Sequence, residues 1–367
     1  MRVLFALPGF HKVDRGAETA LLAVANELAL RGASVTVFGS GYARDGGAYN
    51  FRHVGAIPRT CFQRFPSVPT LRNDTSYEDL TFAFSLAAHF RPGQFDITVT
   101  SNYPHTSWML RRPVLFRRRP RHIFVTQNGD WPALSNESEF KYFACDGLVC
   151  TNPEYYERNR YRWYSALIPN GVDRRRFCPG PSMRGRLNLP KDAEVILMVS
   201  ALVESKRVME GVEAAAGLPN SHLIIAGSGP LRDAVNERAR LLMPGRFTQL
   251  TLPAEDMPAL YNTADVLMHL SLEESFGNIF VEAMATGLPI VAHDSPRVRW
   301  IVGDDEHLVD SMDLKSVTFA LAEALQTERR PVHRIAAKAE RFTWKSVGAS
   351  YHKFFSDVLS PADPESR

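Results

Sequence analysis

Short apolar runs alternate with stretches of helical periodicity along most of the chain. In the first half, apolar runs of strand length occur at residues 3–7, 35–38, 51–54, 96–100, 123–126, 148–151 and 166–168. Apolar side chains recur at helical spacing in residues 16–30, 77–90 and 153–161. Short apolar runs between helices are typical of strands that are buried on both faces. The pattern therefore predicts a parallel sheet covered by helices.

The same alternation starts again after a boundary near residue 169. Asn170-Gly171 is a turn signal, and Pro179-Gly180-Pro181 stops regular structure. Beyond this boundary we expect strands at 195–200, 222–226, 247–250, 264–270 and 288–292, and helices at 209–216, 231–242, 256–262, 315–325, 334–340 and 344–359. The predicted fold is α/β, with two facing Rossmann-like domains, 1–168 and 169–343, and a cleft between them. Residues 344–367 are expected to form a helix that packs back on the first domain, and a tail.

Composition places the chain among ordinary globular proteins. Its 367 residues are 45% hydrophobic and 23% charged, and no apolar run approaches the roughly 20 residues of a membrane helix. The amino-terminal residues read as a first strand and not as a signal peptide, so we expect a cytoplasmic protein. The four cysteines show no metal-ligand spacing.

Positive charge is concentrated in the first half of the chain. The net charge is only +3, but residues 1–170 carry 20 Lys and Arg against 14 Asp and Glu. Six arginines lie in Arg111–Arg121, around an apolar centre. Such a run is usually a solvated face. It could also contact an anionic membrane at the inner membrane face, which we keep as an alternative.

Two carboxylates mark the stretch on which the functional hypothesis depends. Glu274 follows the strand expected at 264–270, and Glu282 lies on the short helix after it. Ligands gather at the carboxyl ends of parallel strands, and the first N–H groups of a helix favour an anion such as a diphosphate. The carboxylates can accept hydrogen bonds from a sugar and a ribose hydroxyl. The simpler alternative is two exposed acids near a helix start.

The residues around the two carboxylates decide between these alternatives. The stretch resembles the E-x7-E signature of retaining glycosyltransferases of glycosyltransferase family four. The matching residues are Glu274, Phe276, Gly277, Glu282, Ala283, Met284, Ala285, Gly287, Pro289 and Val291-Ala292. The stretch Ile168–Phe177, IPNGVDRRRF, resembles that family's entry to its second domain. The resemblance implies the GT-B fold and a nucleotide-sugar donor.

Lys206 matches the lysine that binds the donor phosphates in this family. It follows the expected strand at 195–200, although an exposed surface lysine is the simpler interpretation. The family usually places an arginine at the end of that strand, where this chain has Ser200-Ala201-Leu202, so Arg207 is a candidate substitute. The resemblance implies further donor-binding positions at Gly16, Gly227, Gly229, Leu252, Pro253, Phe276, Gly277, Asn278, Ile279 and Glu282.

The first domain departs more from the family pattern. Many members carry a histidine beside the reacting centre, whereas Asn128 occupies the matching position here. An amide can orient a sugar but cannot act as a base. His11, His105 and Asp130 remain as candidates for acceptor binding or acid–base chemistry, although a lone histidine is more often structural.

These observations predict a retaining, metal-independent glycosyltransferase with Glu274, Lys206 and Asn128 as its catalytic residues. The donor is expected to be a nucleotide-diphosphate sugar, with UDP favoured over GDP. The acceptor is expected to be a glycan, a glycolipid or a small hydroxylated metabolite, and no nucleic acid or resident cofactor is expected. Two alternatives remain open. One is a sugar-nucleotide 2-epimerase of the same fold, and the other is a non-catalytic nucleotide-sugar-binding protein.

Overall fold

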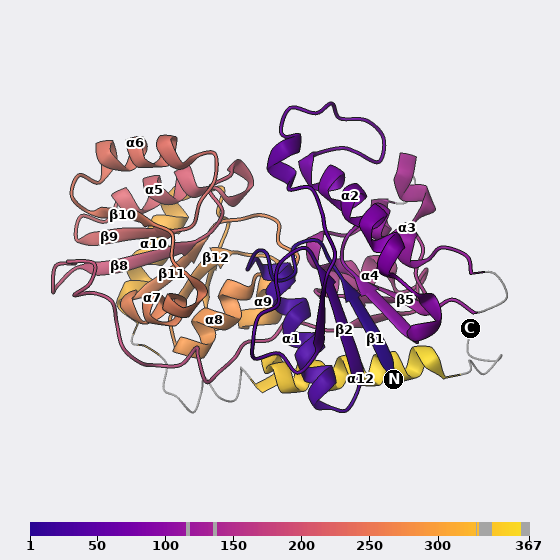
Figure 1. Cartoon of the computed structure of the whole chain (residues 1–367). Helices are drawn as coiled ribbons and strands as arrows, with labels where there is room; N and C mark the ends of the chain where they lie inside the picture. The colour runs from indigo at the N-terminus through magenta and orange to yellow at the C-terminus, as the bar shows by residue number, and fades with distance from the viewer. Residues whose placement is uncertain (115–117, 135–137, 328, 330–339, 361–367) are drawn as a thin grey trace. The chain divides into compact units, whose positions relative to one another are not determined.

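The chain forms two compact units (Figure 1). The computed structural model describes residues 1–114, 118–134, 138–327, 329 and 340–360. Unit 1 consists of Met1–Asn170 and Trp344–Arg367, and unit 2 consists of Gly171–Thr343. The first boundary lies two residues beyond the one expected from the sequence. Of the helix expected at 334–340, all but Glu340 lies outside the described residues.

Unit 1 is built on a seven-stranded parallel sheet with the order β3-β2-β1-β4-β5-β6-β7. The strands are β1 (Arg2–Ala6), β2 (Ser34–Gly39), β3 (Asn50–His53), β4 (Ile97–Thr100), β5 (Arg121–Val125), β6 (Gly147–Cys150) and β7 (Ser165–Leu167). The α-helices are α1 (Gly16–Leu30), α2 (Asp74–His89), α3 (His105–Leu110), α4 (Pro153–Asn159) and α12 (Trp344–Leu359). The strand order changes direction between β1 and β4, which is where open sheets of this kind bind ligands.

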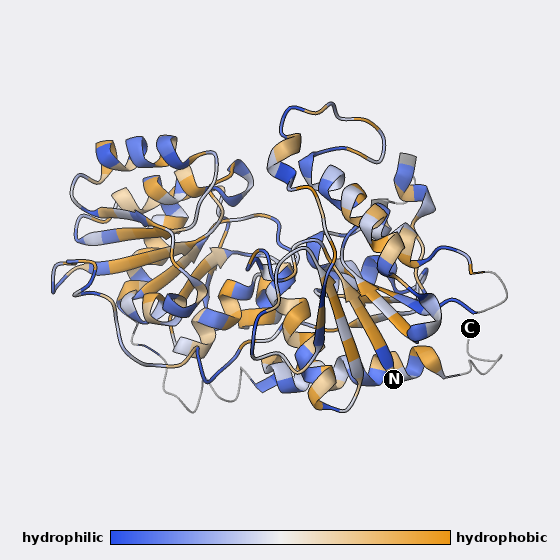
Figure 2. Cartoon of the chain, viewed as in Figure 1, coloured by the Kyte–Doolittle hydropathy of each residue, from blue (hydrophilic) through white to orange (hydrophobic). Residues whose placement is uncertain are grey.

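Alternate side chains of β1 enter two different cores of unit 1. Val3 and Phe5 pack with residues of α1 and α12, whereas Leu4 packs with residues of α2. This period of two is the geometry of a strand that is covered on both faces. The central strands are accordingly mostly apolar, while α1 and α12 alternate between apolar and polar residues (Figure 2).

Unit 2 repeats the architecture with six parallel strands in the order β10-β9-β8-β11-β12-β13. The strands are β8 (Glu194–Val199), β9 (Ser221–Ala226), β10 (Phe247–Leu250), β11 (Val266–His269), β12 (Ile290–His293) and β13 (His307–Val309). The helices are α5 (Val208–Ala216), α6 (Arg232–Leu242), α7 (Met257–Thr263), α8 (Asn278–Thr286), α9 (Pro296–Val302) and α10 (Leu314–Leu325). Here the order changes direction between β8 and β11.

The two faces of the unit 2 sheet are covered by different helices (Figure 1). Val195 and Leu197 pack with the core that α7, α8 and α9 complete. Ile196 and Met198 pack with residues of α5, α6 and α10 on the opposite face. All four side chains are at most 1% exposed, so the central strand is dry on both sides.

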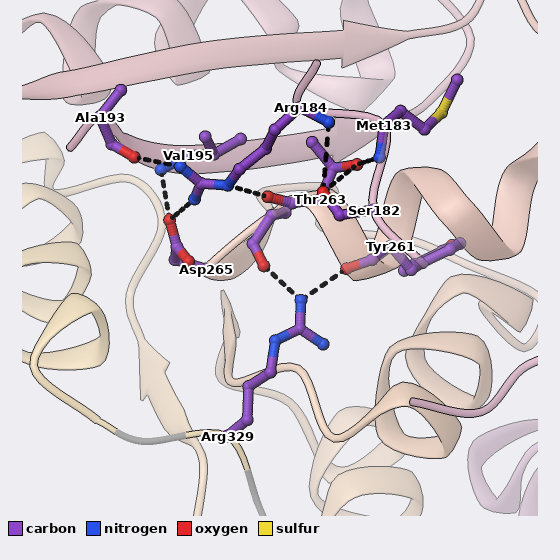
Figure 3. Close-up of polar contacts among 10 residues, drawn as sticks. Ser182, Met183, Arg184, Ala193, Val195, Tyr261, Thr263, Asp265 and Arg329 are labelled. Atoms are coloured by element: carbon purple, nitrogen blue, oxygen red, sulfur yellow. Dashed lines mark hydrogen bonds and ion pairs between the residues drawn. The ribbon is translucent and has the colours of Figure 1, made fainter. Parts of the chain in front are cut away.

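A polar network secures the amino ends of β8 and β11 (Figure 3). The Arg184 guanidinium donates to the carbonyls of Ala193 and Thr263 at 2.9 and 3.2 Å, and to Asp265 Oδ2 at 2.6 Å. The same Asp265 oxygen accepts the Val195 backbone N–H at 2.8 Å. Because this network lies at the amino ends of the strands, their carboxyl ends are left for a ligand.

Each strand expected from the sequence overlaps a strand of the structure. Among the α-helices and strands of the described residues, α3, α9 and β13 were not expected. No helix among the described residues is long and apolar enough to cross a membrane.

Candidate active site

The loop from β11 to α8 is held from both sides. Ser271 Oγ donates to the Ser205 and Glu273 carbonyls at 3.2 and 2.8 Å, which ties this loop to the loop after β8. Arg297 of α9, whose side chain is buried, donates to the Leu272 carbonyl at 3.2 Å. The loop therefore has a defined conformation before it reaches α8.

Gly277 forms the amino-terminal cap of α8 in a left-handed conformation, with φ of +91°. A Cβ atom at this position would lie 2.7 Å from the Phe280 ring. Only glycine fits both the torsion and the contact. No side-chain hydrogen bond caps this end of the helix, where the helix dipole favours an anion.

Glu274 and Lys206 come from two different loops and meet at this edge of the sheet. The Lys206 ammonium forms an ion pair with Glu274 Oε1, and the side chains are 22% and 18% exposed. Lys206 ends a short 3-10 helix, Glu204–Lys206, between β8 and α5. The structure thus brings together the two residues that the sequence placed on the ligand edge.

Glu274 is ionised despite its burial. Burial alone would raise the pKa of this carboxyl. The contact and charge of His269, with the charge and hydrogen bond of Lys206, outweigh that effect and lower the pKa to about 2. A carboxylate of this kind accepts hydrogen bonds only, which suits it to a donor such as a sugar hydroxyl.

Glu282 lies in the second turn of α8 and has a different partner from Glu274. Tyr261, a buried residue of α7, donates its hydroxyl to Glu282 Oε2 at 2.6 Å. Burial raises the pKa of Glu282, although the Tyr261 hydroxyl and the Arg176 charge oppose the shift. Arg329 donates to the Tyr261 carbonyl at 2.9 Å, which fixes the end of α7 that carries the tyrosine (Figure 3).

The glycines after β9 permit close approach to the loop after β8. A Cβ at Gly227, where φ is +154°, would lie 1.9 Å from the Ser200 carbonyl oxygen, and one at Gly229 would lie 2.4 Å from that of Leu202. Leu252 and the exposed Pro253 follow the neighbouring strand β10. These positions all follow the carboxyl ends of neighbouring parallel strands, as the sequence predicts.

Two of the expected donor-binding side chains are engaged elsewhere. The Phe276 side chain is 2% exposed and packs on Trp300 and Phe342. A donor could therefore contact only the backbone of this residue, as proposed also for the backbone of Gly277, Asn278 and Ile279. Arg207 has a left-handed backbone and donates to the Ser311 carbonyl at 3.2 Å. It also pairs with Glu210 at 3.4 Å. This arginine therefore secures the loop after β13 in the described structure.

In unit 1, Asn128 lies at the carboxyl end of β5 with its side chain exposed. Its amide donates to Ser101 Oγ at 3.2 Å and to Asn102 Oδ1 at 3.0 Å, across the end of β4. Gly16 is the first residue of α1. Both positions are at the ligand edge of the unit 1 sheet.

The three titratable candidates of unit 1 have structural partners. His11 bonds the Tyr42 carbonyl at 3.0 Å and the Tyr49 hydroxyl at 2.9 Å, and it stacks on Phe51. Burial lowers its pKa. The histidine therefore has partners on both ring nitrogens, as a structural histidine does.

Asp130 accepts from Asn159 at 2.7 Å and pairs with Arg158 at 3.2 Å, so it anchors α4, and burial raises its pKa. His105 Nε2 is 3.0 Å from the Thr70 carbonyl oxygen. The sequence hypothesis that these residues perform acid–base chemistry gains no support from such contacts.

Two residues near the E-x7-E carboxylates were not expected from the sequence. His269 contacts Glu274, and Tyr261 contacts Glu282. The signal for His269 was a polar residue at the end of an otherwise apolar strand, which needs a partner when it is buried.

Comparison with known proteins agrees with this geometry. The family model described as Glycosyltransferase Family 4 matches residues 15–176, and the model described as Glycosyl transferases group 1 matches residues 181–342. The chain belongs to glycosyltransferase family four and has the GT-B fold. It is a glycosyltransferase.

Curated relatives are similar over part of the chain. The lipopolysaccharide core biosynthesis glycosyltransferase LpsE of Rhizobium meliloti is 26% identical over 223 residues, which are 59% of this chain and 64% of the relative. A GDP-mannose-dependent alpha-(1-6)-phosphatidylinositol monomannoside mannosyltransferase of Mycolicibacterium smegmatis is 29% identical over 276 residues, 66% of this chain and 72% of the relative. The matched regions therefore span about two thirds of these relatives.

Solved structures share the fold over nearly the whole chain. Sucrose-phosphate synthase of Thermosynechococcus elongatus has a TM-score of 0.75 at 19% identity, covering 98% of this chain and 99% of that one. HepE of Anabaena in complex with UDP-glucose has a TM-score of 0.70 at 17% identity, covering 97% and 100%.

Proposed function

We propose that this glycosyltransferase is a retaining, metal-independent enzyme that uses a nucleotide-diphosphate sugar. The observation that carries the proposal is the pairing of Lys206 with Glu274 beside the uncapped start of α8. A cation and the positive end of a helix dipole suit a leaving diphosphate, and a neighbouring carboxylate suits the hydroxyls of the transferred sugar.

Each residue has a separate part in the proposed reaction. The bond from the sugar's anomeric carbon to the diphosphate oxygen breaks, and the growing charge is met by Lys206 and the α8 N–H groups. The acceptor oxygen attacks from the same face, and its proton passes to the leaving phosphate oxygen. Glu274 holds a sugar hydroxyl, Glu282 holds a ribose hydroxyl, and Asn128 orients the sugar or the acceptor.

UDP is the favoured nucleotide in this proposal. HepE of Anabaena was solved with UDP-glucose, and a trehalose-6-phosphate synthase of the same fold was solved with UDP-2-fluoro glucose. The M. smegmatis relative depends on GDP-mannose. A thermal-shift panel of UDP- and GDP-sugars decides the matter, because a bound ligand raises the melting temperature. We expect the largest shift with a UDP-sugar, and a panel without any shift would refute the donor assignment.

The stereochemistry and the metal requirement are tested by the slow hydrolysis of the same donor. Retention predicts that the first sugar released carries the anomeric configuration of the donor, as seen by proton NMR before mutarotation. Excess EDTA is expected to leave the rate unchanged. Deuterium uptake at carbon 2 of the sugar would instead indicate the epimerase reaction.

A glycolipid is the acceptor class that unit 1 supports best. Helices α2 and α3 line a cavity of about 270 Å³. Its lining residues include Leu80, Phe84, Trp108, Met109 and Arg112. Phe84 is 70% exposed. Such a surface suits an acyl chain below an anionic headgroup. Of Arg111–Arg121, Arg119 and Arg121 pair with Asp146, which leaves fewer arginines for lipid than the sequence suggested.

Membrane contact is tested by sedimentation with vesicles. We expect binding to vesicles that contain about 30% anionic lipid, and weaker binding for F84S and R112S. Equal sedimentation with neutral and anionic vesicles would exclude a contact with the anionic headgroup. No sedimentation with either kind of vesicle would exclude the membrane contact and favour a water-soluble acceptor.

A further inference from the structure

The last residue of β11, His269, is buried beside the donor site. Its side chain is 4% exposed, and its Nε2 lies 3.0 Å from Glu274 Oε1. The ring stands perpendicular to that of Phe280, with centroids 5.2 Å apart. Phe280 is itself fully buried on α8. The imidazole is therefore fixed by a strand on one side and by the helix of the E-x7-E stretch on the other.

Glu274 Oε1 has two partners of different character. Lys206 reaches it with a flexible side chain that is 22% exposed, whereas His269 reaches it from the core. A diphosphate carries more negative charge than one carboxylate, so it would compete for the lysine. It would not displace the histidine, which is enclosed by the sheet and α8.

We propose that His269 is a positioning residue for sugar transfer. Through the contact of its Nε2 with Glu274 Oε1, it holds this carboxylate in place when Lys206 turns to the donor diphosphate. The proposal rests on the function proposed above, because it assumes that Glu274 binds a hydroxyl of the donor sugar. With Oε1 held by His269, Glu274 Oε2 is the oxygen directed to the sugar hydroxyl.

The charged groups near Glu274 support this division of roles. His269 reaches it from β11 and Lys206 from the loop after β8, and these two lower the pKa of Glu274 against the effect of burial. Arg297 of α9 is occupied at the Leu272 carbonyl, and Glu273 is the neighbouring acid on the same loop. Removal of His269 leaves Lys206 as the basic side chain in contact with Glu274, and donor binding would draw the lysine away.

Two substitutions separate the hydrogen bond from the rest of the side chain. In H269Q the amide nitrogen can reach the position of Nε2, whereas in H269N it ends near the position of Nδ1 and cannot reach Glu274. Both substitutions place a polar amide in the core, so their general effects on stability should be similar. His222 is a matched control, because it is buried on β9 and bonds Thr248 Oγ1 at 2.9 Å, in the same unit.

The first measurement does not need activity. Carbon-13 NMR of glutamate-labelled protein, with the Glu274 resonance assigned by E274Q, follows the ionisation of this carboxyl with UDP bound. We expect a wild-type carboxyl that stays ionised throughout the acid range in which the protein is folded. In H269N its titration should move towards the ordinary value of about 4.3, whereas H222N should keep the wild-type titration. H269Q keeps the contact but not the charge, so its titration should lie between those of the wild type and H269N. Unchanged titration in H269N would overturn the proposal.

The second measurement is the pH profile of UDP-glucose hydrolysis. We expect kcat of H269N to fall about tenfold to a hundredfold with KM changed less than about threefold, and the acid limb of kcat to move to higher pH. H269Q should recover most of kcat. A purely structural role would lower the melting temperature of H269N without moving the acid limb. If no nucleotide sugar is hydrolysed, the function proposed above fails, while the NMR titration still decides the role of His269.

Discussion

At the scale of single residues, the two carboxylates of the E-x7-E stretch have opposite electrostatic environments. Glu274 is paired with Lys206 and has a pKa of about 2, whereas Glu282 has a neutral tyrosine partner and a raised pKa. We expect E282A to weaken UDP binding about tenfold, because it removes the proposed ribose contact. E274A should slow turnover about a hundredfold and change UDP affinity less than about threefold. Calorimetric titration with UDP and donor-hydrolysis rates measure the two effects.

The two substitutions are expected to affect different quantities, UDP affinity for E282A and turnover for E274A. If E274A loses UDP affinity and E282A keeps it, the two roles are reversed. If both variants keep wild-type affinity and turnover, the donor does not bind at the α8 end of unit 2.

Glu18 in unit 1 is a buried carboxyl that offers a test of stability. It lies in the first turn of α1, 7% exposed, and its Oε2 has no hydrogen-bond partner among the described residues. Burial raises its pKa. Because the folded-state pKa lies above the unfolded value of about 4.3, the stabilisation is fully present below pH 4.3 and is lost as the pH rises from there through the raised folded-state pKa.

We therefore expect E18Q to be more stable than the wild type at pH 7 by about 1 kcal/mol, since it removes the cost of a buried charge. The advantage should disappear near pH 4, where Glu18 is protonated. Urea denaturation at the two pH values measures this difference. E27Q on the same helix is the control and should show no gain. Equal stability of E18Q and the wild type at both pH values would contradict a buried, uncompensated charge.

The residues of the site were predictable from the sequence to different degrees. The positions of Glu274 and Lys206 followed from loops after parallel strands, which local periodicity reveals. The core location of Phe276, the contact of Arg207 with Ser311 and the contact of His269 with Glu274 were not predictable. Each depends on side chains from separate elements, and the apolar pattern of one segment carries no information about them.

At the scale of elements, Gly277 sets the direction in which α8 begins. An alanine there would face the strain of a φ of +91° and a contact of 2.7 Å with the Phe280 ring. We expect G277A to lose about 1–3 kcal/mol of unfolding free energy and at least about tenfold in UDP affinity, because the α8 N–H groups move. Denaturation and calorimetric titration with UDP measure the two losses.

Gly245 provides the matched control for this prediction. It also has a positive φ, of +72°, but a Cβ there would meet nothing within 4 Å, and it lies before β10 at the amino end of the sheet. G245A should be destabilised by backbone strain and keep its UDP affinity. Equal losses of affinity in both variants would mean that general destabilisation, and not the start of α8, weakens binding.

Elements were predictable where the apolar run was long enough to show a period. The twelve strands expected from the sequence overlap β1 to β12, and most of them are buried and largely apolar. β13 is a three-residue edge strand, His307–Val309, with half-buried side chains. α9 starts with Pro-Arg and carries two arginines in seven residues. In such short segments, pairing with a neighbouring strand or packing on a sheet decides the structure, and local composition does not.

At the scale of the whole molecule, the chain passes between its two units twice. It leaves unit 1 after Asn170 and returns at Trp344. Within unit 2 the two passages run together, because the Val172 N–H donates to the Phe342 carbonyl at 2.7 Å and Val172 pairs with Thr343. The last helix, α12, then packs in the core of unit 1, although unit 2 precedes it in the sequence. The core of unit 1 is therefore completed only after α12 has been synthesised.

This connectivity predicts that damage to α12 affects unit 1 and spares the nucleotide site. Phe355 is fully buried in the core that α1 and α12 share, so F355A should cost about 3–5 kcal/mol in the free energy of unfolding of unit 1. In scanning calorimetry we expect one transition to fall to lower temperature, while the transition that UDP raises keeps its position and its UDP dependence. F319A is the control, because Phe319 is 65% exposed on α10 and its truncation should change neither transition. A single transition that falls in F355A and still responds to UDP would show that the two units unfold together, and that the stability of the donor site depends on the last helix of the chain.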